Sequence, residues 1–259
     1  REIKILVIKM GFSQVDKDLI TVFDTINRLS FNSICVSFSD IRRESGLHPQ
    51  TLTNLLKRGR TLGLIADCSE LGLGSGYTVL QKFIISLEQS VVNEVVEVNK
   101  DFIVMKHTVR NKMYNNAGLP IYGAFIKVFG DVVLDKPLIY KGSKVYEVKF
   151  HESVDKYYFF HFDEDVEVKP GETYTYEYEF YLKYFPPVDY FIYESFNPGM
   201  LLTIKTYLTK SGKSVIKDVK VEHPPTVKIF NENRGKTYHE VEVKKITAYS
   251  SIKLLFYLA

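Results

Sequence analysis

The chain has 259 residues, a formal net charge of +3, and the apolar (45%) and charged (25%) fractions of an ordinary globular protein. This length favours two domains over one, and the small charge means that any case for nucleic-acid binding must rest on one region. No apolar run reaches the roughly 18 residues of a membrane span, and charges interrupt residues 1–12 where a secretory signal is apolar. We therefore expect a cytoplasmic protein.

The first third of the chain predicts three helices. Apolar residues recur at helical spacing behind Asp16, a suitable N-cap, which predicts a helix over 16–30. Ser39 is expected to cap a second helix that ends at Gly46. Pro49 stands where a helix-starting proline belongs and predicts a third helix.

Two short strands are expected to follow the third helix. "RTLGLI" and "YTVL" flank the glycine-rich stretch "ADCSELGLGSG", which predicts strand, flexible tip and strand. Residues 81–98 fit either a helix or a strand, and we favour a helix to about 90 followed by a strand. The two cysteines, Cys35 and Cys68, lack the spacing of a zinc site and are expected to be reduced thiols.

This order of elements, carried by "FSDIRRESGLHPQTLTNLLKRGRTLGLI", resembles the winged helix-turn-helix superfamily of DNA-binding domains over residues 16–80. Residues 40–60 hold five basic side chains and two acidic ones. The third helix is expected to turn polar side chains outward once its leucines are buried. The candidate DNA-binding residues are Arg42, Arg43, His48, Gln50, Thr51, Thr53, Asn54, Lys57, Arg58 and Arg60.

Two features leave an ordinary solvated helix face open as the alternative. The tip between the two strands has no basic residue and carries Asp67 and Glu70, so it is expected to add little to DNA binding. Five basic groups are also few phosphate contacts for one copy, which favours a homodimer on two half-sites. By analogy with the superfamily, the predicted helix at 81–90 could form the dimer contact.

Beyond residue 91, apolar and polar residues alternate in short runs separated by turns, the pattern of antiparallel strands. In "ETYTYEYEFYLKYFPP" one face is expected to carry a core stripe of Tyr174, Tyr176, Tyr178, Phe180, Leu182 and Tyr184. Strands without crossover helices favour a sandwich or a barrel over a parallel sheet. We expect one immunoglobulin-like sandwich, with two smaller ones as the alternative. The predicted fold class is α+β, with a winged helix-turn-helix domain over 1–90 and an all-β antiparallel sandwich over 91–259.

The remaining motifs do not predict an active site. "SGKS" at 211–214 has Tyr207 where a P-loop has its first glycine, so a hairpin turn is favoured. His161, Asp163 and Asp165 share a strand face but are better explained as a solvated strand end than as a metal site. We expect no enzyme activity, no cofactor and no metal.

The leading functional hypothesis is a DNA-binding transcription regulator whose sandwich binds a ligand or a protein partner. The alternative is a non-enzymatic interaction scaffold, in a defence or signalling complex, that uses the winged helix as a docking module. Because fold alone does not disclose function, the sandwich itself assigns neither. Double-stranded DNA, a second copy of the chain and an unknown sandwich ligand or protein are the expected partners, and no membrane is expected.

Overall fold

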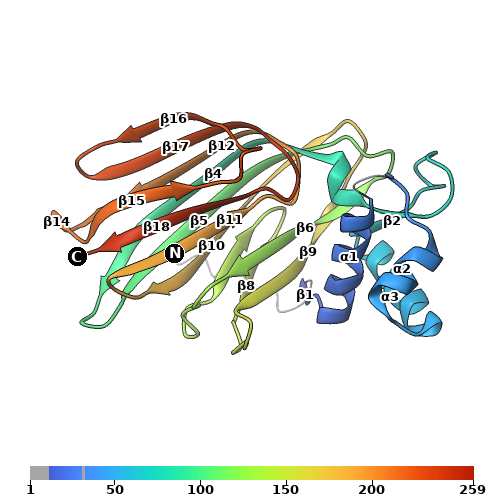
Figure 1. Cartoon of the computed structure of the whole chain (residues 1–259), viewed down its shortest axis with the longest axis horizontal. Coiled ribbons are helices and arrows are strands. Elements are labelled where there is room, and N and C mark those ends of the chain that lie inside the picture. Colours follow the sequence, from blue (N-terminus) through green and yellow to red (C-terminus); the bar gives the residue numbers. More distant parts are fainter. Residues whose placement is uncertain (1–11, 31–32) are drawn as a thin grey trace, which may run out of the picture.

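The computed structural model describes residues 12–30 and 33–259 and gathers three helices at one end of an elongated β-structure (Figure 1). These helices are α1 (Lys17–Leu29), α2 (Phe38–Ser45) and α3 (Pro49–Thr61). Asp16 caps α1 as predicted, since its side chain accepts a hydrogen bond from the Leu19 amide. The second helix starts earlier than predicted, because Ser37 and not Ser39 is its cap.

A small hairpin follows the helices. Strands β2 (Ile65–Asp67) and β3 (Tyr77–Val79) pair antiparallel, and the glycine-rich stretch forms the tip between them, as predicted. A disulfide joins Cys35, just before α2, to Cys68, just after β2. The prediction of two reduced thiols is therefore wrong, because the fold brings together two cysteines that lie 33 positions apart.

The helix predicted at 81–90 is wrong. A 3₁₀ turn, η1 (Leu80–Phe83), leads directly into β4 (Ile84–Val98), which pairs along its length with β5 (Ile103–Asn115). Alternate side chains of β4 are buried, so burial follows the two-residue period of a strand and not the helical spacing that the sequence also fits. The domain boundary predicted at residue 90 falls inside this strand, and the proposed dimer contact loses its helix.

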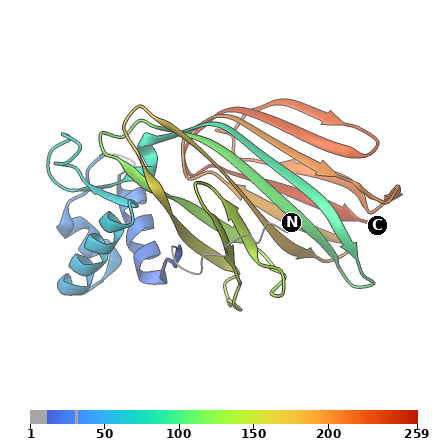
Figure 2. The same cartoon turned by 180° about the vertical axis from the view of Figure 1, so that it is seen from behind.

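The β-structure contains two layers. One layer is an eight-stranded sheet in the order β16-β17-β12-β4-β5-β10-β7-β8, and its long strands β4 and β5 lie in front in Figure 2. Its remaining strands are β7 (Leu138–Lys141), β8 (Val145–Val148), β10 (Thr173–Tyr184), β12 (Gly199–Tyr207), β16 (Ile229–Arg234) and β17 (Tyr238–Ile246). The predicted aromatic stripe of β10 is confirmed as core, because Tyr176, Phe180 and Leu182 are buried.

The second layer consists of two separate three-stranded sheets. One has the order β1-β9-β6 and the other has the order β11-β18-β15. Their strands are β1 (Phe12–Gln14), β6 (Ile121–Phe129), β9 (Tyr157–Val168), β11 (Val188–Glu194), β15 (Ile216–Glu222) and β18 (Ser251–Leu258). One continuous apolar core lies between the layers. A hairpin of β13 (Thr209–Lys210) and β14 (Lys213–Ser214) confirms the turn predicted at "SGKS".

The predicted fold class is wrong for the chain as a whole. Strands dominate the described residues, which contain only three short α-helices against eighteen strands, so the protein is mostly β rather than α+β. The predicted immunoglobulin-like antiparallel sandwich is also wrong, because β12 pairs parallel with β4 at the centre of the large sheet and the facing layer is split. The resemblance of residues 16–80 to the winged helix-turn-helix superfamily stays a prediction.

The helices are attached to the β-structure at two places. Strand β1 adds to the edge of β9 just before α1 begins. An apolar cluster then joins the buried face of α1 to Phe159 of β9, with Phe196 and Tyr249 packed against it. This contact forms one wall of a cleft.

Candidate functional site

The residues predicted to contact DNA lie on or beside α2 and α3, and several of them are engaged within the chain. Arg43 pairs with Asp40 at 2.7 Å, Arg58 pairs with Asp16, and Arg60 pairs with Glu70 of the hairpin tip. The charges of these three guanidinium groups are therefore partly neutralised within the chain.

The polar members of the predicted set cap or decorate α3. The His48 ring accepts a hydrogen bond from the Gln50 amide and caps the helix, while the Thr53 hydroxyl donates to the Pro49 carbonyl. Gln50 and Asn54 contact each other at 3.5 Å. Arg42, Thr51 and Lys57 are exposed. Over residues 12–83 eight basic and seven acidic side chains nearly cancel, so this part lacks the basic excess expected of a DNA reader.

A cleft of about 340 Å³ opens where α1 meets the β-structure. This volume lies within the range of small-molecule sites, about 300–1,000 Å³. One wall comes from α1 and carries Asp24. The opposite wall comes from β6, β9, the end of β11 and the segments that follow β11 and β17, which are far apart in sequence. Its lining is Lys17, Ile20, Thr21, Asp24, Lys127, Asp155, Tyr157, Phe159, Glu194, Phe196 and Tyr249.

The charged groups of the cleft form two ion pairs and leave one carboxylate over. Lys17 pairs with Asp155 at 3.0 Å, and Lys127 pairs with Glu194. Asp24 forms no ion pair or side-chain hydrogen bond within the part of the chain that the structure describes. Desolvation raises the pKa of Asp24 above its ordinary value, Lys127 opposes this shift, and Glu194 adds to it. The cleft therefore carries one unbalanced negative charge at neutral pH.

Aromatic rings form most of the remaining wall. The Lys127 ammonium lies 4.8 Å from the centre of the Tyr157 ring and 5.7 Å from that of Phe196. Tyr249 packs edge-on against Phe196, and its buried hydroxyl has no hydrogen-bond partner within the described residues. These rings already hold one cation, an arrangement that the negative face of an aromatic ring favours.

Tyr249 is held in an unusual backbone conformation. Its φ of +63° lies in the left-handed region, which a bulky side chain rarely adopts. Its amide donates to the Ser195 carbonyl, and the Ser195 amide donates to the Ser250 carbonyl. These two bonds fix the Tyr249 ring in the wall, and such outliers occur preferentially at ligand sites.

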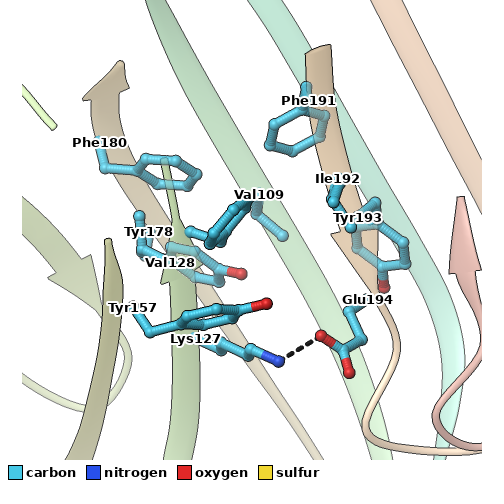
Figure 3. A pocket seen from close by; sticks show the side chains of 11 residues that line it. Val109, Lys127, Val128, Tyr157, Tyr178, Phe180, Phe191, Ile192, Tyr193 and Glu194 are labelled. Atoms are coloured by element: carbon cyan, nitrogen blue, oxygen red, sulfur yellow. Dashed lines mark hydrogen bonds and ion pairs between the residues drawn. The ribbon is translucent and has the colours of Figure 1, made fainter. Parts of the chain in front are cut away.

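A second, smaller cavity of about 40 Å³ adjoins the cleft (Figure 3). Lys127, Tyr157 and Glu194 line both, so the Lys127–Glu194 pair stands between the cleft and the interior. Beyond this pair the lining is apolar and aromatic, and it includes Phe180 of β10 and Phe191 of β11. The smaller cavity thus extends from the polar cleft into the space between the two layers.

No family model and no curated protein matches this chain. Among solved structures, an M1 zinc metallopeptidase from Deinococcus radiodurans aligns with 69% of this chain at 8% identity and a TM-score of 0.39. A putative protease from Parabacteroides distasonis aligns with 68% at 10% identity and a TM-score of 0.36. The alignments span 44% and 40% of those two chains. At these TM-scores the likeness assigns neither fold nor activity to this chain.

The prediction of a DNA-binding transcription regulator is nevertheless wrong. The charge of residues 12–83 is nearly balanced, and Arg43, Arg58 and Arg60 pair with acidic side chains of the same chain. The alternative of a scaffold that docks through its winged helix stays a prediction, because the charge balance bears on DNA binding and not on protein docking. No helix among the described residues is long and apolar enough to cross a membrane, and these residues contain no metal-binding group of His, Cys, Asp and Glu.

The sequence interpretation missed the cleft. Its key residues are single side chains in unrelated segments, and Asp24 and Glu194 lie 170 positions apart. Asp24 is an ordinary exposed position of an amphipathic helix in the sequence pattern. The one signal in the sequence is the density of aromatic residues around Tyr157, and such a run is more typical of a core strand.

Proposed function

We propose that this protein binds a small organic cation with an apolar body in the cleft between α1 and the β-structure, and that it does so without catalysing a reaction. The observation that carries the proposal is the Asp24 carboxylate, which is unpaired within the described residues of a cleft whose other four charged groups pair with one another. A ligand cation supplies the missing charge.

The aromatic walls support the same ligand class. A ring or short alkyl chain packs against Phe159 and Phe196, while an ammonium or guanidinium group lies near Asp24. Hydrogen bonds that involve charged groups contribute about 1.5–3 kcal/mol each, which corresponds to a factor of roughly 10 to 150 in affinity. The negative charge of Asp24 repels a ligand that carries a carboxylate in place of the cation.

Three probes of similar size test the proposal by isothermal titration calorimetry at pH 7. They are 2-phenylethylamine, 3-phenylpropionate and 2-phenylethanol, which carry a cation, an anion and a neutral group on the same ring. We expect the amine to bind at least about tenfold more tightly than the other two. Equal binding of the three probes, or tighter binding of the carboxylate, would contradict the proposal.

Two variants on the same helix provide the matched control. Asp24→Asn removes the charge in the cleft, and Asp18→Asn removes a charge from an exposed position of α1 outside it. The preference for the amine should disappear in the first variant and persist in the second. Loss of the preference in both variants would mean that it comes from the overall negative charge of α1 and not from Asp24, which would contradict the proposal.

The cytoplasmic location and the homodimer stay predictions. The Cys35–Cys68 disulfide is typical of oxidising compartments and of proteins from hyperthermophiles. It therefore weighs against an ordinary reducing cytosol.

A further inference from the structure

The second layer has two strand edges that face each other without pairing. Strand β6 is the last strand of the sheet β1-β9-β6, and β11 is the first strand of the sheet β11-β18-β15. Both border the smaller cavity, β6 through Lys127, Val128 and Phe129 and β11 through Phe191 to Glu194. Each edge therefore presents backbone amides and carbonyls that no neighbouring strand uses.

The distance between these edges is too large for direct pairing. The Cα atoms of β6 and β11 lie more than 8 Å apart at nearly all positions, whereas paired residues have Cα atoms about 4.5–5.5 Å apart. Since neighbouring strands are spaced about 4.7–4.9 Å, two strands with one between them lie about 9.5 Å apart. We call this space, between β6 and β11, the seam.

Side chains rather than backbone span the seam. The Lys127–Glu194 ion pair crosses it at the end near the cleft, and the rings of Phe129 and Tyr190 stack across its outer side at 6.4 Å. Figure 3 shows Glu194 and Tyr193 on one side of the gap and Lys127 and Tyr157 on the other. Both exposed rings, Tyr157 at 42% and Tyr190 at 41%, remain accessible from outside.

We propose that the seam binds an extended peptide segment of another protein, which enters as a strand between β6 and β11. The inserted strand pairs with both edges and joins the two small sheets into one, the recognition mode known as strand addition. A folded second copy cannot supply this strand, because its own edge strands are attached to a sheet on one side. The occupant must therefore be an unfolded or terminal segment.

The lining specifies the side chains of that segment. Alternate residues of a strand point to opposite faces. Those that point inward meet a cavity of only about 40 Å³ between Val109, Tyr178 and Phe180, so they must be small and apolar. Those that point outward meet the exposed rings and the Lys127–Glu194 pair, where polar residues fit.

Charge at the cleft end favours a basic residue in the inserted segment. At the end near Asp189, Lys156 and Lys183 line the same pocket as Asp189 and Asp131, so charges balance there. At the other end the seam opens into the cleft with its unbalanced carboxylate. A lysine at the cleft end of a strand as long as the seven-residue β11 therefore complements that carboxylate. The backbone pairing itself does not depend on the cleft.

The test uses the fluorescein-labelled peptide Lys-Ala-Thr-Ala-Thr-Ala-Lys and the same peptide with N-methyl groups on alternate residues. N-methylation removes the donors that face one edge and leaves the composition, charge and side chains unchanged. By fluorescence anisotropy we expect the unmodified peptide to bind at least about tenfold more tightly. Absence of binding, or equal binding of the two peptides, would overturn the proposal.

Hydrogen exchange locates the bound strand. Alternate amides of β6 and β11 should exchange more slowly in the complex, while those on the outer edge of β16 serve as the control, because β16 ends the large sheet. Protection at β16 instead, or protection of the seam amides by dimerisation of the free protein, would refute the proposal. The difference in affinity between the two peptides should persist in Asp24→Asn. The proposal of strand addition at the seam is therefore tested independently of the proposal of cation binding in the cleft.

Discussion

Removal of the Cys35–Cys68 disulfide should lower the stability of the fold by a predictable amount. The bond ties the segment before α2 to the end of β2 and closes a loop with a sequence separation of 33. A loop of this length corresponds to about 3.7 kcal/mol of lost chain entropy in the unfolded state. At about 2–4 °C per kcal/mol for a chain of this size, the midpoint of thermal unfolding should fall by about 7–15 °C.

Circular dichroism melts in the presence and absence of a heat-stable phosphine reductant measure this effect. The unaltered protein should melt at a lower temperature when reduced, and the variant Cys35→Ser/Cys68→Ser should melt near the reduced protein in both conditions. The variant thus controls for effects of the reductant elsewhere in the chain. Coincident melts of the oxidised and reduced protein would refute the reasoning, since the bond would then constrain nothing in the unfolded state.

Three further predictions concern the core and the cleft. Gly123→Ala should destabilise the protein by about 1–3 kcal/mol in urea unfolding, because a Cβ there would lie 2.5 Å from the Phe162 carbonyl oxygen; unchanged stability would contradict the close approach. Burial lowers the pKa of His107 to about 3. Between pH 6.5 and 3 the His107 side chain therefore binds a proton in the unfolded state but not in the folded state. The free energy of unfolding should fall by about 1.4 kcal/mol per pH unit over this range. The contribution of His107 is the difference in free energy of unfolding between the unaltered protein and His107→Gln at each pH. A difference that does not change with pH would contradict the lowered pKa. Asp24→Asn should keep or raise the melting temperature at pH 7, because a carboxyl with a raised pKa is stabilised in its protonated form and its charge opposes folding at neutral pH; a clear decrease would mean that Asp24 has a structural role.

The helices could be predicted because their signals are local. Asp16 and Pro49 mark the starts of α1 and α3, and Gly46 ends α2 with a φ of +68°. The β10 stripe could be predicted as well, because apolar or aromatic residues at every second position from Tyr174 to Tyr184 are typical of a strand with one buried face. These features depend only on near neighbours in the sequence.

The sheet arrangement could not be predicted in the same way. Strand β4 pairs with β12, more than a hundred residues away, and the parallel direction of that pair has no local signal. The apolar residues of 84–91 satisfy a helical period by chance, and the tertiary pairing decides the outcome. The predictions of the fold class and of the 81–90 helix failed at this step.

The cleft depends on the same distant contacts. Its walls combine α1 with the end of β11 and the segment after β17, so no single stretch of sequence contains both walls. The residues predicted to bind DNA were chosen by exposure on α3, and the sequence could not reveal that Asp16 and Glu70 pair with Arg58 and Arg60. A count of charges along a short stretch of sequence does not include acidic residues that the fold brings next to the basic ones.

The central claim, that Asp24 receives a ligand cation, is tested most directly by the pKa of its own carboxyl. Carbon-13 NMR of the side-chain carboxyls, assigned by comparison with Asp24→Asn, can follow this titration in the free protein and at saturating 2-phenylethylamine. Desolvation raises the pKa of Asp24 in the free protein, and a bound ammonium group should lower it, while 2-phenylethanol should leave it unchanged. An Asp24 pKa that does not move when the amine binds would contradict the account.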